Sequence, residues 1–94
     1  MIRRESNQPT GLLIVLADRA AEFGDRHDAA MDLGSYDEPE VEVALLAVAS
    51  NLSEDPDIAD AAGESLSEVW RRKGKKDPGV VAAMHPEARK FFEQ

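Results

Sequence analysis

The chain has 94 residues and no cysteine, and its 19 acidic and 11 basic side chains give a formal net charge of −8. This length allows one small domain, and an apolar share of 43% can supply its packed core. The lack of cysteine excludes disulfides and thiolate chemistry and is typical of a reducing compartment, so we expect a cytoplasmic protein. The longest apolar run, Leu12 to Ala17, is too short for a membrane span or an export signal.

Charge is distributed unevenly along the chain. Residues 18–68 contain 15 acidic and two basic side chains, whereas residues 71–76 contain five basic side chains and no acidic one. The acidic middle repels nucleic-acid phosphates and favours encounter with a basic partner. We therefore expect no direct binding of nucleic acid, although acidity that serves only solubility is the alternative.

The N-terminal third predicts two helices after a loose arm. Met1 to Pro9 show no apolar period, which predicts a flexible N-terminal arm. Thr10 is placed to cap a first helix whose apolar residues recur at helical spacing as far as Phe23. Gly24 is expected to end that helix. A short second helix should follow from Asp25 to Gly34, where glycine would take the left-handed conformation.

A third helix is predicted from Val41 to about Ser50. Asp37 and Pro39 form a capping start ahead of it. Because its apolar residues lie on almost every side, we expect it to be the central and most buried element. A β-strand is the alternative, but no second alternating run is available to pair with it.

A fourth helix is predicted from the next aspartate-proline pair, Asp55-Pro56. The cations Arg71 to Lys73, followed by Gly74, suit its C-terminal end better than they suit a nucleic-acid patch. Two short elements should start at Asp77-Pro78 and His85-Pro86, and an aromatic pair should close the core. The predicted buried stripe and that pair are Ile58, Ala62, Leu66, Val69 and Trp70, then Phe91 and Phe92.

Two segments share the pattern D-x-x-D-A-A at an offset of 32 residues, Asp25 to Ala30 and Asp57 to Ala62. Helix pairs that repeat at such spacing are typical of α-solenoids. The sequence therefore predicts an all-α fold of about five or six helices, arranged as a short right-handed stack of antiparallel helix pairs in a single domain over residues 10–94. The expected pairs are Gly11 to Gly34, Asp37 to Gly74, and Asp77 to the C-terminus.

The stretch from Leu33 to Trp70, LGSYDEPEVEVALLAVASNLSEDPDIADAAGESLSEVW, resembles the short HEAT-like repeats of phycobilisome-lyase-type proteins. It shares their leucine-glycine, aspartate-proline turn, first helix of Val, Ala and Leu, and second helix with paired alanines. The resemblance covers 38 of the 94 residues and implies a scaffold that holds a partner on its second helices. Small acidic proteins of this kind also resemble immunity proteins of bacterial toxin systems, which bind and block a cognate toxin. Fold alone does not fix function.

Four acidic residues recur at helical spacing opposite the apolar stripe of the fourth helix. They form a ridge about 16 Å long, enough to meet several Lys or Arg side chains of a partner. An ordinary solvated face, with Glu68 partly neutralised by Arg72, is the alternative. The turn before the third helix adds an aromatic residue and two acids. The predicted partner-binding residues are Tyr36, Asp37, Glu38, Asp57, Asp60, Glu64 and Glu68.

No motif indicates catalysis. His27 and His85 are the only histidines and lack metal-binding spacing, and the helical serines Ser65 and Ser67 have no neighbouring histidine. Neither a nucleophile elbow nor a phosphate-binding loop is present. We therefore expect no catalytic residue, no metal and no cofactor.

The favoured function is an immunity-type inhibitor whose acidic face covers a basic toxin domain, expected to be a nuclease. A HEAT-like scaffold or subunit module of a larger assembly, without an inhibitory role, is the main alternative. A lyase-like repeat that handles a cofactor is a third, which the lack of cysteine and ligand clusters disfavours. We expect no membrane contact.

Overall fold

The computed structural model describes residues 8–93, and this part of the chain is helical without β-strands. The predicted all-α class is therefore confirmed for these residues. A short 3-10 turn, η2, spans Leu33–Ser35 between the second and third helices. The α-helices are α1 (Thr10–Ala17), α2 (Phe23–Asp32), α3 (Pro39–Ala49), α4 (Pro56–Lys73), α5 (Pro78–Ala82) and α6 (Pro86–Arg89).

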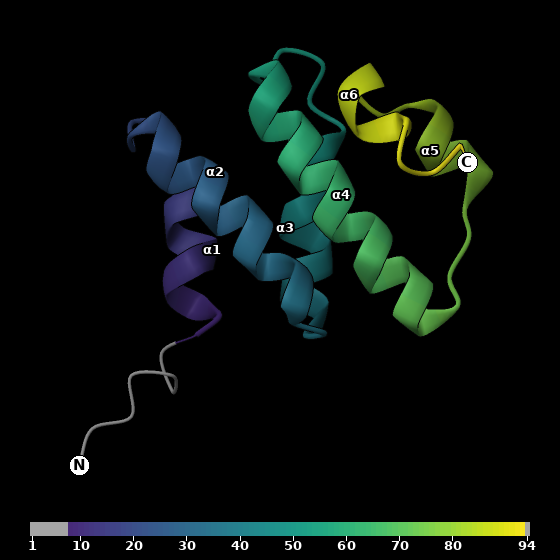
Figure 1. The fold of residues 1–94 in the computed structure, drawn as a ribbon, viewed down its shortest axis with the longest axis horizontal. Coiled ribbons are helices and arrows are strands. Elements are labelled where there is room, and N and C mark those ends of the chain that lie inside the picture. The colour runs from purple at the N-terminus through teal and green to yellow at the C-terminus, as the bar shows by residue number, and fades with distance from the viewer. Residues whose placement is uncertain (1–7, 94) are drawn as a thin grey trace.

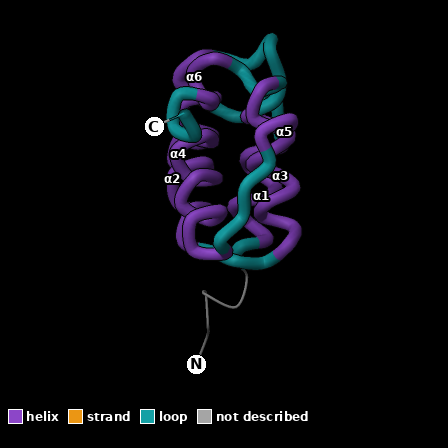
Figure 2. Tube along the Cα trace, turned by 90° about the vertical axis from the view of Figure 1, so that its right-hand side faces the viewer, coloured by secondary structure: helices purple, strands orange, loops and turns teal. Residues whose placement is uncertain are grey.

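The helices lie in two layers. Figure 2 shows α2, α4 and α6 on one side and α1, α3 and α5 on the other. Figure 1 looks onto the first of these layers, in which α2 and α4 lie side by side and run in the same direction. The resulting slab measures 45 × 30 × 16 Å.

Helix α4 is the central element of the fold. It contacts α2, α3, α6 and η2, and ten of its 18 residues are buried, including the whole predicted stripe. Its start is as predicted, because the Asp55 carboxylate accepts hydrogen bonds from the backbone N–H of Asp57 at 2.8 Å and of Ile58 at 3.4 Å. Its end is also as predicted, at Gly74, whose φ is 65°.

The expectation that the third helix would be the most buried is wrong. Helix α3 buries Val41, Leu45 and Ala49, whereas Val43 is 68% exposed. Because α3 packs mainly against α4, its opposite side faces solvent, so a helix that is apolar on nearly every side leaves some apolar residues exposed. Its N-cap is Glu38 rather than Asp37, and Glu38 makes no side-chain capping bond.

The first helix ends earlier than predicted. Helix α1 stops at Ala17, and after a turn α2 begins at Phe23 and runs through Gly24. Arg26 gives the physical reason for the break. Its Nε donates a hydrogen bond of 3.1 Å to the carbonyl of Leu16 and so satisfies the open end of α1.

The start of α1 also differs from the expectation. Pro9 is buried and occupies the N-cap position, so Thr10 is the first residue of the helix rather than its cap. The Gln8 side-chain oxygen accepts a hydrogen bond of 3.2 Å from the backbone N–H of Leu12. The rest of the predicted arm, Met1 to Asn7, lies outside the described residues.

Two glycines mark close approaches between helices. Gly34 does not have the predicted left-handed conformation, because α2 continues into η2 there. A Cβ at Gly34 would lie 2.9 Å from Ser65 Oγ, so the residue is small because α4 packs on it. A Cβ at Gly63 would collide with the backbone of Ala88 and lie 2.7 Å from its Cβ. Helix α6 therefore rests directly on the backbone of α4.

The C-terminal helices begin where the sequence predicts. The Asp77 carboxylate accepts a hydrogen bond of 3.2 Å from Val80 N–H at the start of α5, and His85 Nδ1 accepts one of 3.0 Å from Glu87 N–H at the start of α6. The backbone N–H of His85 donates a hydrogen bond of 2.8 Å to the backbone carbonyl of Ala49, which connects the start of α6 to the end of α3.

Candidate functional site

The acidic residues of α4 lie along its uncovered side. Asp57 and Glu68 are exposed, while Asp60 and Glu64 are half-buried. The residues between them pack against the neighbouring helices. With offsets of three, seven and eleven residues, the four carboxylates share one face over about 16 Å.

Helix α2 extends this surface beside α4. In both helices the D-x-x-D-A-A segment buries its two alanines, and the first aspartate stays exposed. Helices α2 and α4 are parallel neighbours in one layer (Figure 1). The exposed aspartates at equivalent positions of the two segments therefore belong to one side of that layer. Sequence reasoning missed the α2 residues, although the repeat itself was the signal. We call the combined surface the acidic face; it consists of Asp25, Asp28, Asp32, Asp57, Asp60, Glu64 and Glu68.

Most carboxylates of the acidic face have no cationic partner among residues 8–93. Asp60 is the exception, with its Oδ2 2.6 Å from Lys90 Nζ. Asp60 and Glu87 together raise the pKa of Lys90 through hydrogen bonds. Glu68 is not neutralised by Arg72, because the Arg72 guanidinium pairs with Asp37 at 2.7 Å instead. The Glu68–Arg72 pair expected within α4 is therefore not formed, while an ordinary solvated face stays the alternative to a binding surface.

The predicted turn residues lie beyond the C-terminal end of the acidic face. Tyr36 is half-buried and packs against the core, and Asp37 is exposed beside Arg72. Glu38 is exposed but starts α3, in the other layer. The Glu68 carboxylate lies close to Gly34, so it is the ridge residue nearest this turn.

A buried ion pair was not predicted from the sequence. The guanidinium of Arg26 donates to Glu54 Oε1 at 3.1 Å and to Oε2 at 2.9 Å, with the two side chains only 8% and 1% exposed. Arg19 adds a third contact at 3.3 Å. The hydrogen bonds from Arg26 lower the pKa of Glu54, although burial opposes this. One sequence feature could have indicated this ion pair: Arg19 and Arg26 are the only basic residues within the acidic stretch 18–68.

Three of the five cations of residues 71–76 are paired with internal acids. Glu42 of α3 accepts from Lys73 at 3.0 Å and from Lys75 at 2.5 Å, and these hydrogen bonds lower the pKa of Glu42. Together with the Arg72 pair, these contacts fasten the end of α4 to the start of α3. The basic stretch thus has a largely structural role.

Comparison with protein-family models, curated proteins and solved structures gave no match. Among residues 8–93, no helix combines the length and apolar character needed to cross a membrane. Within the same range, no group of three or more His, Asp or Glu side chains is placed to hold a metal ion. The candidate site is therefore defined by its geometry and its charge.

Proposed function

We propose that this chain is a cytoplasmic protein-binding module that presents its acidic face to a basic protein. The observation that carries the proposal is the set of carboxylates on α2 and α4 that have no cationic partner among residues 8–93. A partner's Lys and Arg side chains would supply the missing counter-charges and accelerate association. The lysines of a nucleic-acid-binding surface are spaced to meet phosphates, and a row of carboxylates about 16 Å long can meet the same side chains.

In its specific form, the proposed function is that of an immunity protein that binds and neutralises a basic toxin domain, with a nuclease as the expected toxin. The acidic face would cover the phosphate-binding surface and exclude substrate by both bulk and charge. A fold of three HEAT-like helix pairs, α1 with α2, α3 with α4, and α5 with α6, belongs to this proposal. The 32-residue offset of two parallel neighbouring helices supports it, since second helices line one face in such stacks.

The direct test is co-expression with the protein encoded immediately upstream in the same genome. We expect that protein to be basic, to arrest growth of a bacterial host when expressed alone, and to bind this chain in calorimetry. Growth should recover when both are expressed. Binding without any growth arrest by the neighbour would instead indicate a scaffold role, and absence of binding would reject the neighbour as the partner.

Charge reversal tests the face itself. Asp57→Lys with Glu64→Lys changes the net charge by +4 on α4 and leaves the Asp60–Lys90 contact intact. Glu40→Lys, Val43→Lys and Ala47→Lys produce the same change on the exposed side of α3, and serve as the matched control. We expect the α4 variant to associate with the basic partner at least tenfold more slowly than the parent protein, and the control variant to show a much smaller effect. Equal effects would show that only net charge matters.

A further inference from the structure

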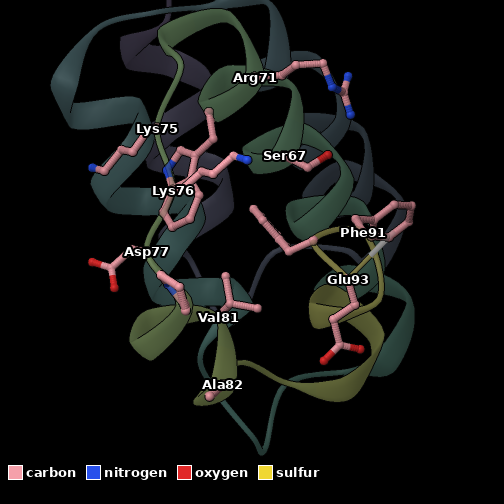
Figure 3. Close-up of a pocket in the computed structure, with 12 residues that line it drawn as sticks. Ser67, Arg71, Lys75, Lys76, Asp77, Val81, Ala82, Phe91 and Glu93 are labelled. Atoms are coloured by element: carbon pink, nitrogen blue, oxygen red, sulfur yellow. The ribbon is translucent and has the colours of Figure 1, made fainter.

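An open cleft of about 680 Å³ lies where the end of α4 meets α5 and the chain after α6 (Figure 3). Its apolar lining includes Trp70, Val81, Phe91 and Phe92. A volume of this size is in the range of small-molecule binding sites. The cleft lies outside the acidic face, on the one segment of the chain that is strongly basic.

Trp70 carries an unsatisfied polar group beside this cleft. The residue is only 4% exposed, and its ring packs edge-on against Phe92 with 5.1 Å between centroids. Its indole Nε1–H has no hydrogen-bond partner among the described residues. Buried indole N–H groups normally have an acceptor. Trp70 therefore contributes to the region of the cleft both an apolar ring and a donor that is unpaired within residues 8–93.

The cationic side chains around the cleft differ in how they are engaged. Lys75 is paired with Glu42 and points away from the cleft, whereas Lys76 extends across it (Figure 3). Arg71 lies at its edge. Neither Arg71 nor Lys76 pairs with an acid among residues 8–93. The two are therefore available to a ligand.

The acids that line the cleft are already engaged. Asp77 accepts the backbone hydrogen bond that caps α5, and Glu93 pairs with Arg89 at 3.3 Å. Asp77 keeps its negative charge, but the two cations Arg71 and Lys76 outnumber it, so the charge left for a ligand is positive in a protein whose net charge is −8.

We propose that this cleft binds a small organic anion that has an aromatic or branched apolar body and one carboxylate. The body would lie against Trp70 and Val81, and the carboxylate would face Lys76 and Arg71. A basic protein partner does not suit this cationic site, so the inference does not depend on the function proposed for the acidic face.

The probe for this test is 3-phenylpropionate, added to the purified full chain at constant ionic strength. Since Trp70 is the only tryptophan, its fluorescence and its single indole N–H resonance report on the cleft alone. We expect both signals to change in a saturable manner. Acetate lacks the apolar body and 3-phenylpropionamide lacks the charge, so both should bind at least fivefold more weakly. Equal binding of the amide, or no change at Trp70, would overturn the proposal.

Substitutions of the cations test where the carboxylate of 3-phenylpropionate binds in the cleft. We expect Lys76→Gln and Arg71→Gln each to weaken 3-phenylpropionate binding by about two- to fivefold. Arg72→Gln removes the same charge one residue further along α4, from a side chain paired with Asp37, and is the matched control. All three positions are exposed, so the fold should be retained, which circular dichroism would verify. A loss with Arg72→Gln as large as with the other two would refute the assigned position of the anion.

Discussion

Arg26 and Glu54 join segments that are distant in the sequence. Their two hydrogen bonds connect α2 to the loop before α4, while Arg26 also closes the end of α1. A buried pair of this kind contributes little net stability relative to apolar residues, but removal of one partner leaves an isolated buried charge. The break between α1 and α2 therefore depends on Glu54, in the loop between α3 and α4.

We expect Glu54→Gln to lower the free energy of unfolding at pH 7 by about 3 kcal/mol, because it leaves the charge of Arg26 buried without a counter-ion. Urea unfolding followed by circular dichroism measures this difference. Glu40→Gln, which removes an exposed carboxylate unpaired within residues 8–93, should change stability by less than about 0.5 kcal/mol. Similar values for the two variants would contradict the role assigned to the pair.

The same comparison has a defined pH dependence. Hydrogen bonds from Arg26 lower the pKa of Glu54 in the folded state below its ordinary value of 4.5, so the unfolded state binds more protons in acid. The stabilisation that the ionised Glu54 contributes is complete above about pH 4.5 and is lost as the pH falls through the pKa of Glu54 in the folded state. The stability gap between the parent protein and Glu54→Gln should therefore narrow with acidification. A gap that stays constant down to pH 3 would argue against this linkage.

Gly63 tests how closely two helices approach. A methyl group there would meet the backbone of Ala88, which cannot rotate away, so we expect Gly63→Ala to destabilise the protein by about 1 to 3 kcal/mol. Gly24→Ala is the control, since nothing lies within 4 Å of the added carbon in α2. That change should be neutral or stabilising by up to about 1 kcal/mol. Thermal unfolding of both variants gives the comparison.

At the scale of elements, helix starts were more predictable than helix ends. The starts of α4, α5 and α6 depend on an aspartate or histidine followed by proline, which is a local signal. The end of α1 depends on Arg26, ten residues further along, and no local pattern indicates it. The apolar period that continued to Phe23 was misleading, because that side chain is 49% exposed.

The candidate site was likewise predictable where it depends on local sequence and not where it depends on contacts between distant segments. The spacing of acids on α4 follows from the sequence, because all four positions lie within one helix. The contribution of α2 requires that two helices 32 residues apart lie parallel, and the pairing of Arg72 with Asp37 requires a contact between residues 35 apart. The central position of α4 over α3 also depends on layering, which apolar content alone does not indicate.

Capping can be compared between two helices of this protein. Asp55 accepts two backbone hydrogen bonds at the start of α4, whereas Glu38 occupies the same position in α3 and accepts none through its side chain. We expect Asp55→Ala to reduce the free energy of unfolding by about 1 kcal/mol. Glu38→Ala should have an effect below about 0.5 kcal/mol. Chemical denaturation measures both effects. A larger loss of stability with Glu38→Ala than with Asp55→Ala would contradict the capping assignment.

At the scale of the whole molecule, positive and negative charges are separated. The acidic face occupies α2 and α4. Arg71 and Lys76, which pair with no acid among residues 8–93, lie at the cleft by the C-terminal end of α4. A binding partner would therefore approach in a preferred orientation.

We predict that association with a basic partner depends strongly on ionic strength. An increase from about 0.05 M to about 0.5 M shortens the screening length to a few ångströms, so association should slow by about tenfold or more while dissociation changes little. Stopped-flow or surface-based kinetics measures both rates. Salt-independent association would mean that the acidic face does not guide encounter.

The slab is only 16 Å thick, which is the depth of two helices. Every helix has a side toward water, but α4 buries ten of its 18 residues, more than any other helix. Partial detachment of a neighbouring helix would expose the side chains that it covers. Amide protons of α4 around Leu66 should consequently exchange with deuterium only when the whole domain opens, whereas those of α1 and α5 should exchange through local fraying. The helix that contacts α2, α3, α6 and η2 thus sets how long the whole domain stays closed.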